Sequence, residues 1–487
     1  MALVTSGFAF AKVDYRVIPL PQSIKMDAKA RTIEWKADAT PKTVVDLKGE
    51  NAEAYRIVVD QKGVTVHGAS EAGVFYGLQT FQKSIALEEG ETVTLPMAVV
   101  EGAPRFKYRG VHLDCARHFM PLGFIYRFID ILALHQVNEF HWHLTDDQGW
   151  RFEVKSMPLL TQKGSYRPFT VVGKNCGIYD DSPETGYYTQ EEMRQVVAYA
   201  REHHINIIPE IDLPGHMVAA LSVYPELGCT GGPYAVWSDW GVSPDILCAG
   251  NPKVLPFLKQ ILGELCDVFP SKIIHIGGDE SPRDRWQQCP KCQAKMKELG
   301  LKNEAQLQTY INKELDKFLT SRGRTLMGWD ETLEGGLSEN AMIMSWRGEE
   351  GGVAAARQHH EAVMTPGGWC YFDHYQLRNK NPQDQNIQPL GIGGYLPLSK
   401  VYGYDPVPKE LSAEEAKYIV GVQCNLWSEY LVSPQHVEYM LMPRLAALSE
   451  VQWLETDRKN YDDFQQRLQN MERIYDKKGW SYCPRYE

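Results

Sequence analysis

Two adjacent carboxylates, Asp279 and Glu280, follow a short apolar segment at residues 272–276. The segment is typical of a parallel strand that is covered on both faces. Successive side chains on a strand point to opposite faces, but Gly277 and Gly278 can adopt backbone conformations that other residues avoid. They can therefore turn the chain until both carboxylates enter one cleft. An exposed pair that opens the next helix is the alternative, and the buried strand in front of the pair favours the cleft.

Further polar and aromatic side chains lie where other predicted strands end. In a barrel of parallel strands, the groups that do chemistry gather at the carboxyl ends of the strands. Carboxylates beside tryptophan rings indicate acid chemistry on a sugar that is held by stacking and by hydrogen bonds to its hydroxyls. In chain order, these residues are Arg109, Asp114, Arg117, His118, His141, His143, Asp146, Asp147, Glu210, Asp212, His216, Trp329, Trp346, Tyr371, Asp373, Trp427 and Glu429.

The chain from residue 104 to residue 487 predicts the barrel that would position these side chains. Strand, loop and helix alternate there, which is the pattern of a parallel α/β fold, and eight repeats fit a (β/α)8 TIM barrel with enlarged loops. An open doubly wound sheet is the alternative, but no Gly-rich phosphate loop follows the first strand. The eight predicted strands are 108–114, 139–144, 205–211, 272–277, 325–329, 341–346, 361–365 and 418–425, and the main predicted helices are 121–136, 190–203, 252–269, 305–322, 434–453 and 461–478, the last two closing the ring.

Residues 13–103 predict a small α/β supporting domain in front of the barrel. Two short strands, 55–60 and 63–68, flank a tight turn, and residues 70–86 carry apolar side chains at helical spacing. Residues 92–100 return as a strand, and nothing in this domain has obvious chemistry.

Residues 1–12 resemble the end of a secretory signal, since they are small and apolar and end in Ala9-Phe10-Ala11 before a lysine. We therefore treat them as a residual leader outside the fold and expect an exported protein, whether periplasmic, at the cell surface or secreted. A native terminus without a leader role is the alternative.

Composition excludes several classes of partner. The net charge of −11 over 487 residues disfavours nucleic acid and anionic membrane surfaces, which reward clustered Lys and Arg. No apolar run approaches the length of a membrane span. The 12 Trp and 25 Tyr supply flat faces of the kind on which sugar rings stack. The sequence does not distinguish a monomer from a homodimer.

Cysteines and histidines raise the question of a metal. Cys289 and Cys292 have the spacing of half a zinc site, but no second pair of matching spacing follows, so spare thiols or a local disulfide are favoured. Cys229 and Cys248 flank one loop and can pair in an oxidising compartment. His141 and His143 could hold a metal together with His216 or His275, although structural hydrogen bonding is the more ordinary use of such histidines. No cofactor and no metal is predicted.

The spaced set of motifs resembles the family 20 glycoside hydrolases, the β-N-acetylhexosaminidases. The run His-Ile-Gly-Gly-Asp-Glu at 275–280 is similar to the active-site signature of that family. The resemblance extends to the small N-terminal domain, so it covers nearly the whole chain. The other segments that carry it are Arg109 to Asp114 with Arg117-His118-Phe119, His141 to Asp147, Pro209 to Asp212 with Pro214-Gly215-His216, Gly328-Trp329, Tyr371 with Asp373, and Leu426 to Glu429.

The resemblance implies an exo-acting enzyme that removes terminal, non-reducing β-linked N-acetylglucosamine or N-acetylgalactosamine from glycans. Catalysis would retain the anomeric configuration and pass through an oxazoline intermediate, because the acetamido oxygen of the substrate replaces an enzyme nucleophile. Glu280 would be the general acid, Asp279 would hold the acetamido nitrogen, and Tyr371 would donate to its carbonyl oxygen.

The remaining implied roles concern the relay and the sugar. Asp146 and His216 resemble the relay behind Glu280, Arg109 and Glu429 would bind the distal hydroxyls with help from Asp373, and Trp329, Trp346 and Trp427 would wall the acetamido pocket and the sugar. Apolar walls and the neighbouring charge of Asp279 lead us to expect a raised pKa for Glu280.

Three other hypotheses remain open from the residues. An ordinary retaining glycosidase would use Glu210, Asp212 or Glu429 as its nucleophile. A sugar-binding protein on an inactive scaffold would lack the acid, whereas Glu280 is present. A metal hydrolase would be inactivated by a chelator. The preference for gluco or galacto sugars, and the natural glycan, are not predicted.

Overall fold

The computed structural model describes residues 13–378 and 388–484, so the predicted leader at 1–12 lies outside the described residues. By its packing the chain divides into two compact units. One comprises residues 13–105, 134–136 and 445–480, and the other comprises residues 106–133, 137–444 and 481–484. The predicted division into domains at residues 103 and 104 stays a prediction.

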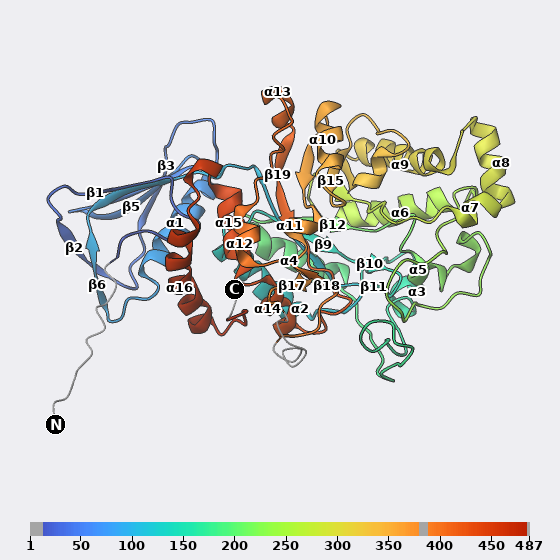
Figure 1. Ribbon diagram of the computed structural model, residues 1–487, viewed down its shortest axis with the longest axis horizontal. Helices are drawn as coiled ribbons and strands as arrows, with labels where there is room; N and C mark the ends of the chain where they lie inside the picture. The colour runs from blue at the N-terminus through green and yellow to red at the C-terminus, as the bar shows by residue number, and fades with distance from the viewer. Residues whose placement is uncertain (1–12, 379–387, 485–487) are drawn as a thin grey trace. The chain divides into compact units, whose positions relative to one another are not determined.

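The second unit is built around a closed barrel of eight parallel strands, and this confirms the predicted fold class. Each predicted strand is present, and neighbouring strands pair in parallel around the ring (Figure 1). Since all eight run in the same direction, their carboxyl ends share one edge of the barrel. The strands are β8 (Tyr108–Asp114), β9 (Glu139–His143), β12 (Asn206–Glu210), β13 (Ile273–His275), β14 (Thr325–Trp329), β15 (Met342–Ser345), β16 (Ala362–Met364) and β19 (Ile419–Cys424).

Helices lie between most barrel strands, and their starts follow local capping chemistry. Thr189 and Glu192 form a capping box, in which each side chain accepts a hydrogen bond from the backbone of the other residue, and the Asn303 side chain caps the helix that begins at Glu304. The main helices of this unit are α2 (Leu122–Leu134), α4 (Gln190–Glu202), α6 (Val254–Val268), α9 (Glu304–Ser321), α10 (Glu350–Arg357) and α14 (Pro434–Leu441).

None of the helices in the described part of the chain is long and apolar enough to cross a membrane.

The connections between the barrel strands also carry short elements of their own. The short elements are β10 (Thr145–Asp146), β11 (Gly149–Trp150), α3 (Leu159–Gln162), α5 (Val218–Leu221), η1 (Pro225–Leu227), α7 (Asp284–Gln288), α8 (Pro290–Leu299), η2 (Asp330–Leu333), α11 (Gly367–Cys370), β17 (His374–Tyr375), β18 (Gly393–Tyr395), α12 (Leu398–Gly403) and α13 (Ala413–Ala416).

The first unit is a five-stranded sheet in the order β1-β7-β4-β5-β3, with a two-stranded sheet of β2 and β6. Helix α1 (Glu71–Ile85) packs against the larger sheet, as the apolar spacing of 70–86 predicts. The predicted strand 92–100 is two strands in the structure. The strands are β1 (Ser23–Met26), β2 (Thr32–Lys36), β3 (Lys42–Val45), β4 (Tyr55–Asp60), β5 (Gly63–Gly68), β6 (Thr92–Pro96) and β7 (Ala98–Gly102).

The last two helices depart from the sequence prediction. The predicted helix 434–453 is interrupted at Pro443, which lacks a backbone N–H, and becomes α14 and α15 (Arg444–Trp453). Helix α15 from Leu445 onward and α16 (Tyr461–Lys478) belong to the first unit, so the prediction that they close the barrel ring was wrong. Trp453 packs among the rings of Tyr55 and Tyr76, with centroids 6.3 and 5.3 Å away. The aromatic side chains of the first unit offer this helix an apolar surface that the periodicity alone does not reveal.

Candidate active site

The turn after β13 places the two adjacent carboxylates as the sequence predicts. Gly277 and Gly278 have φ angles of +65° and +98°, in the left-handed region that favours glycine. A Cβ atom on Gly277 would lie 1.8 Å from Oδ1 of Asp212, and the Gly278 N–H donates to that same oxygen over 3.2 Å. The second glycine also accepts a hydrogen bond of 2.7 Å from the Gln308 amide. The turn is therefore held tightly on both sides.

Replacing Gly277 by alanine is expected to lower both stability and turnover. A non-glycine residue in this region costs about 1–2 kcal/mol, and the clash also displaces Asp212 and the backbone that leads to Asp279. Gly300→Ala is the matched control, because Gly300 has the same φ of +65° but no described atom within 4 Å of an added Cβ. Thermal unfolding and kcat would be measured for both variants. Normal kcat in Gly277→Ala would show that the turn is not needed to place the carboxylates.

Asp279 is a buried carboxylate with one oxygen left open. Its side chain is almost inaccessible, and Oδ1 has no hydrogen-bond partner among the described residues. Burial, with smaller contributions from Glu210 and Glu280, raises the pKa of Asp279 to about 6, although the charge of His216 opposes the rise. A buried acceptor that lacks a donor is suited to receive an N–H from a ligand.

Glu280 lies next to Asp279 but in a different environment. Its side chain is 41% exposed, and Oε2 lies 3.6 Å from Nε2 of His216. Nδ1 of that histidine contacts Oδ1 of Asp146 at 3.0 Å, so the predicted relay residues are brought together in one line. The contact with His216 lowers the pKa of Glu280, so the expectation of a raised pKa was wrong for the ligand-free site. The burial that was expected to raise the pKa of Glu280 instead raises that of Asp279.

Arg117 places a guanidinium group among the carboxylates of the site. Its guanidinium contacts Asp114 at 3.2 Å and Asp146 at 2.9 Å, and it lies 5.1 Å from the centre of the Trp427 ring. The charge of Arg117 also acts on Glu429 and Asp373, whose pKa values burial raises. Both oxygens of Asp373 are buried and have no hydrogen-bond partner among the described residues. These two carboxyl groups and one guanidinium form a polar surface that can bind hydroxyls.

Arg109 is not part of this surface, so its predicted role as a sugar ligand was wrong. It is the second residue of β8, near the amino end of the strand, and its guanidinium donates to the Phe106 carbonyl over 3.0 Å. Strand alternation gives it the opposite direction to His112, whose ring lies inside the barrel 4.9 Å from that of His141. Arg117, which follows the same strand, lies instead over the Trp427 ring, and its charge acts on Glu429.

Glu210 is the centre of a polar cluster inside the barrel. Its carboxylate contacts His143 at 2.6 Å, His141 at 3.0 Å and His275 at 3.0 Å, and accepts a hydrogen bond of 3.0 Å from the Trp329 indole. The charges of these histidines hold the pKa of Glu210 well below its usual range, in spite of its burial. His143 is hydrogen-bonded to Glu210, His141 accepts a hydrogen bond from Gln423, and His275 accepts one from the Gly277 N–H, so the histidines have structural hydrogen bonds, as the sequence suggested. Trp329 is completely buried and lies 5.8 Å from Trp427.

The rings of Trp346 and Tyr371 form a second wall. Their centroids are 6.1 Å apart and their planes differ by 22°. The Trp346 indole donates to Glu331 over 3.0 Å. Burial and then the nearby charge of Asp279 raise the pKa of Glu331 to about 8. Sequence reasoning missed Glu331, although it comes two residues after Trp329 at the end of a barrel strand, where the rule used for the other carboxylates would have found it.

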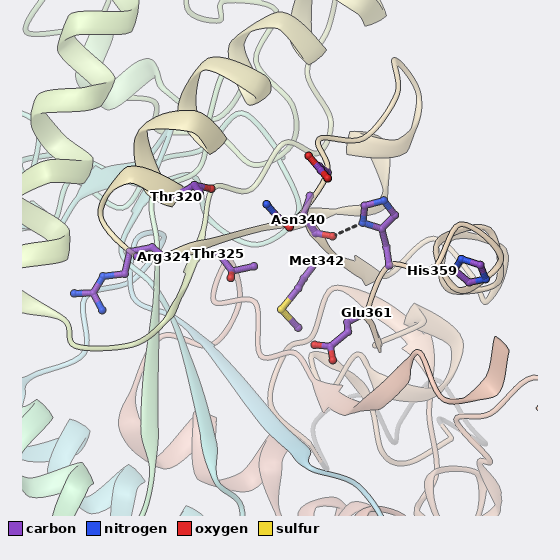
Figure 2. A pocket seen from close by; sticks show the side chains of 11 residues that line it. Thr320, Arg324, Thr325, Asn340, Met342, His359 and Glu361 are labelled. Carbon is purple, nitrogen blue, oxygen red and sulfur yellow. Dashed lines mark hydrogen bonds between the residues drawn. The ribbon is translucent and has the colours of Figure 1, made fainter. Parts of the chain in front are cut away.

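A pocket of about 450 Å³ opens beside Glu280. Its lining includes Gly278, Arg283, Gln308, Glu331 and Arg347. A second pocket, of about 460 Å³, lies at the other end of the strands, where β14 and β15 begin (Figure 2). Thr325 and Met342 line this second pocket. It lies at the opposite end of the strands from the carboxylates and therefore takes no part in their chemistry.

The carboxyl edge of this (β/α)8 barrel combines buried carboxylates, an arginine and stacked aromatic rings. This combination indicates a glycoside hydrolase. Residues 106–456 match the catalytic domain of glycosyl hydrolase family 20, and residues 27–102 match domain 2 of the same family. The chain therefore belongs to glycosyl hydrolase family 20.

Relatives and solved structures agree with this membership. The chain is 44% identical to a β-hexosaminidase of Porphyromonas gingivalis over 86% of its own length, but it spans only 53% of that relative. It is 30% identical to a β-hexosaminidase of Akkermansia muciniphila, over 94% of this chain and 90% of the relative. An exo β-N-acetylglucosaminidase from Vibrio harveyi, solved with N-acetylglucosamine, superposes with a TM-score of 0.81 at 28% identity, over 97% of this chain and 78% of that one.

Proposed function

We propose that the chain is an exo-acting β-N-acetylhexosaminidase that removes terminal β-linked N-acetylglucosamine or N-acetylgalactosamine with retention, by substrate-assisted catalysis. The observation that carries the proposal is the open, buried oxygen of Asp279 beside Glu280. An acetamido N–H supplies the donor that this oxygen lacks. The names of the relatives support the activity, and the glycan is the only partner that the proposal requires.

In the first step, Glu280 donates a proton to the glycosidic oxygen as the bond from that oxygen to the anomeric carbon breaks. The acetamido oxygen forms a bond to the same carbon, and the product is an oxazoline ring with positive charge shared along its N–C–O unit. The Asp279 carboxylate accepts a hydrogen bond from the ring nitrogen and stabilises this charge. Tyr371 donates to the attacking oxygen and orients it.

In the second step, Glu280 accepts a proton from water, and the water oxygen attacks the anomeric carbon. The oxazoline opens, and two inversions leave the original configuration. His216 and Asp146 act behind Glu280: the histidine pKa is raised by Asp146, Asp147 and Glu280, so its positive charge steadies the ionised form that this step needs. The first step needs the protonated form. A leaving group bound over the exposed Glu280 carboxyl removes water from it and raises its pKa in the complex.

An enzyme nucleophile is poorly supported by the surroundings of the candidates. All the contacts of Glu210 are with the histidines and the tryptophan inside the barrel, and the Oδ1 atom of Asp212 holds the Gly278 N–H. Attack by either residue would break these bonds, and the third candidate, Glu429, is proposed as a ligand of the sugar hydroxyls, so we propose the acetamido oxygen as the nucleophile.

Three aryl glycosides with the same leaving group test the proposed activity: the N-acetyl-β-glucosaminide, the N-acetyl-β-galactosaminide and the β-glucoside. We expect hydrolysis of one or both N-acetyl sugars and none of the glucoside, because the glucoside lacks the group that attacks. Comparable hydrolysis of the glucoside would contradict the proposal.

Glu429→Gln is expected to weaken recognition of the sugar hydroxyls and to change the ratio of the rates on the gluco and galacto epimers. Loss of one charged hydrogen bond in a buried site costs about 1.5–3 kcal/mol, which is about 10- to 150-fold in kcat/KM. Glu361→Gln is the control, since Glu361 carries a carboxylate before β16 at the opposite end of the barrel. Unchanged kinetics on both epimers in Glu429→Gln would remove this residue from the sugar site.

We also propose export of the protein, on the signal-like composition of residues 1–12. Fractionation of the native cells, followed by assay of each fraction, tests this. Activity confined to the cytoplasm would contradict it.

A further inference from the structure

Four cysteines from two separate loops converge at one point of the barrel unit. Cys229 and Cys248 lie in the loop that follows β12, and Cys289 and Cys292 lie in the loop that follows β13. Their sulfur atoms all lie within 4.8 Å of one another, and three of the four side chains are buried. All ten cysteines of the chain are free thiols in the structure, so nothing covalent holds these four together.

The separations between the sulfur atoms are those of a tetrahedral metal site. Cys229 and Cys292 are 3.8 Å apart, Cys248 and Cys289 are 3.7 Å apart, and Cys248 and Cys292 are 3.6 Å apart. Zinc binds thiolate sulfur at about 2.3 Å, and the edge of the resulting tetrahedron is about 3.8 Å. A disulfide brings two sulfurs to about 2.05 Å. The sulfurs of Cys248 and Cys292 each have two other cysteine sulfurs as close neighbours, which a single disulfide cannot satisfy.

The backbone around the cysteines is shaped to present their sulfurs. Cys289 is the residue before the first turn of α8, and Cys292 is in that turn, where the partial positive charge of a helix amino terminus favours thiolates. An added Cβ on Gly250 would lie 2.2 Å from the backbone of Lys291 and 2.4 Å from the nitrogen of Cys292, so the two loops meet closely there.

We propose that Cys229, Cys248, Cys289 and Cys292 form a four-thiolate site for one structural zinc ion. Four sulfur ligands complete the tetrahedron and leave no open position, so the site has no place for substrate or catalytic water. Binding releases the thiol protons to solvent and involves no change of oxidation state.

The site would fasten together the two loops that carry the acid and its relay. His216 lies in the loop after β12, upstream of Cys229, and Glu280 lies in the loop after β13, upstream of Cys289. Two other contacts join the same loops: the Trp286 indole donates to the Leu247 carbonyl over 2.8 Å, and Arg285 pairs with Asp245 at 2.9 Å. The zinc ion would hold these loops in register and so support the position of His216, 3.6 Å from Glu280.

The spacing of the cysteines explains why the sequence disfavoured zinc. The expected second pair was sought after Cys292, whereas it lies before Cys289. Cys248 and Cys289 are 41 positions apart in the sequence, and Cys229 and Cys292 are 63 positions apart. Cys229 and Cys248 are brought close by the antiparallel bridge between Gly228 and Leu247. The two pairs of cysteines are distant in the sequence, and they can act as four ligands of one ion only after the two loops have folded together.

The test measures zinc in the purified full-length chain by elemental analysis, together with a count of free thiols in denaturant. We expect about one zinc per chain in wild type, its loss in Cys292→Ser, and an unchanged content in Cys176→Ser, whose thiol is exposed and lies outside the cluster. Exchange of the metal for cobalt should give the absorption of tetrahedral cobalt bound to thiolates, a readout independent of activity and of the folding of any variant.

Two outcomes would overturn the proposal. One is a chain that contains no zinc and takes up neither zinc nor cobalt after gentle reduction, with the four thiols free. The other is a chain in which these four residues form two disulfides in the native protein, as peptide mapping without reduction would show.

Discussion

Replacing Glu280 by glutamine is expected to lower kcat by about 10²–10⁴-fold on substrates with poor leaving groups. Glutamine keeps the size of the side chain but cannot give a proton to the glycosidic oxygen. The loss should be small on aryl substrates whose leaving groups need no proton. Binding of the sugar should survive, because Arg117 and the aromatic rings are unchanged.

The comparison of leaving groups separates this prediction from simple damage to the site. A series of aryl N-acetyl-β-glucosaminides of different phenol acidity should show a steeper dependence of kcat on that acidity in Glu280→Gln than in wild type. An equal loss for good and poor leaving groups would remove Glu280 from the role of general acid. Glu334→Gln is a suitable control, because Glu334 lines the same pocket and pairs with Arg283 and Arg347.

Asp279→Asn is expected to lower kcat by about 10²–10³-fold with a smaller effect on KM. The carboxylate stabilises positive charge that appears only as the oxazoline ring forms, so its loss weakens the transition state more than the bound substrate. A large rise in KM with unchanged kcat would show that Asp279 merely binds the sugar.

Asp279→Asn, which is expected to lower kcat, is also expected to raise the stability of the folded protein at high pH. Because the folded-state pKa of Asp279 is about 6, above the ordinary value of 3.8, the folded protein binds the proton more tightly than the unfolded chain. The stability that this group contributes is therefore complete below about pH 4 and is lost as pH rises through 6. Asp279→Asn should match wild type at low pH and exceed it by up to about 3 kcal/mol above pH 7. Thermal unfolding of both proteins across this pH range tests the prediction. A difference in stability that does not change with pH would contradict it.

Much of the fold could be predicted from the sequence because its signals are local. Several barrel strands, such as β13, β15 and β16, contain a short apolar run bounded by loops, which is the pattern of a parallel strand buried on both faces. The turn at Gly277 and Gly278 was equally predictable, since two glycines between a buried strand and two carboxylates favour a backbone conformation that other residues avoid. The gathering of Asp146, His216 and Glu280 at one edge followed from the rule for parallel barrels, whereas their role as a relay was implied by the family resemblance.

The errors arose where the outcome depends on contacts between distant segments. Arg109 and Arg117 both belong to the first barrel strand and the loop after it, and only the direction of alternation and the position along the strand separate the buried arginine from the one in the site. The pKa of Glu280 depends on His216, whose approach is set by another loop. The four cysteines come from two loops, and no local sequence pattern predicts that these loops contact each other. The packing of Trp453 in the first unit is likewise not predicted by a local pattern.

The most direct test of the acetamido oxygen as nucleophile is the rate of hydrolysis of aryl β-glucosaminides whose N-acyl group carries zero, one, two or three fluorine atoms. Fluorine withdraws electrons from the carbonyl oxygen and weakens it as a nucleophile, while the leaving group and the sugar stay the same. We predict a steep, progressive fall of kcat/KM along the series, with the trifluoroacetyl substrate the slowest. A flat series, in which the trifluoroacetyl sugar is hydrolysed as fast as the acetyl sugar, would show that the protein supplies the nucleophile.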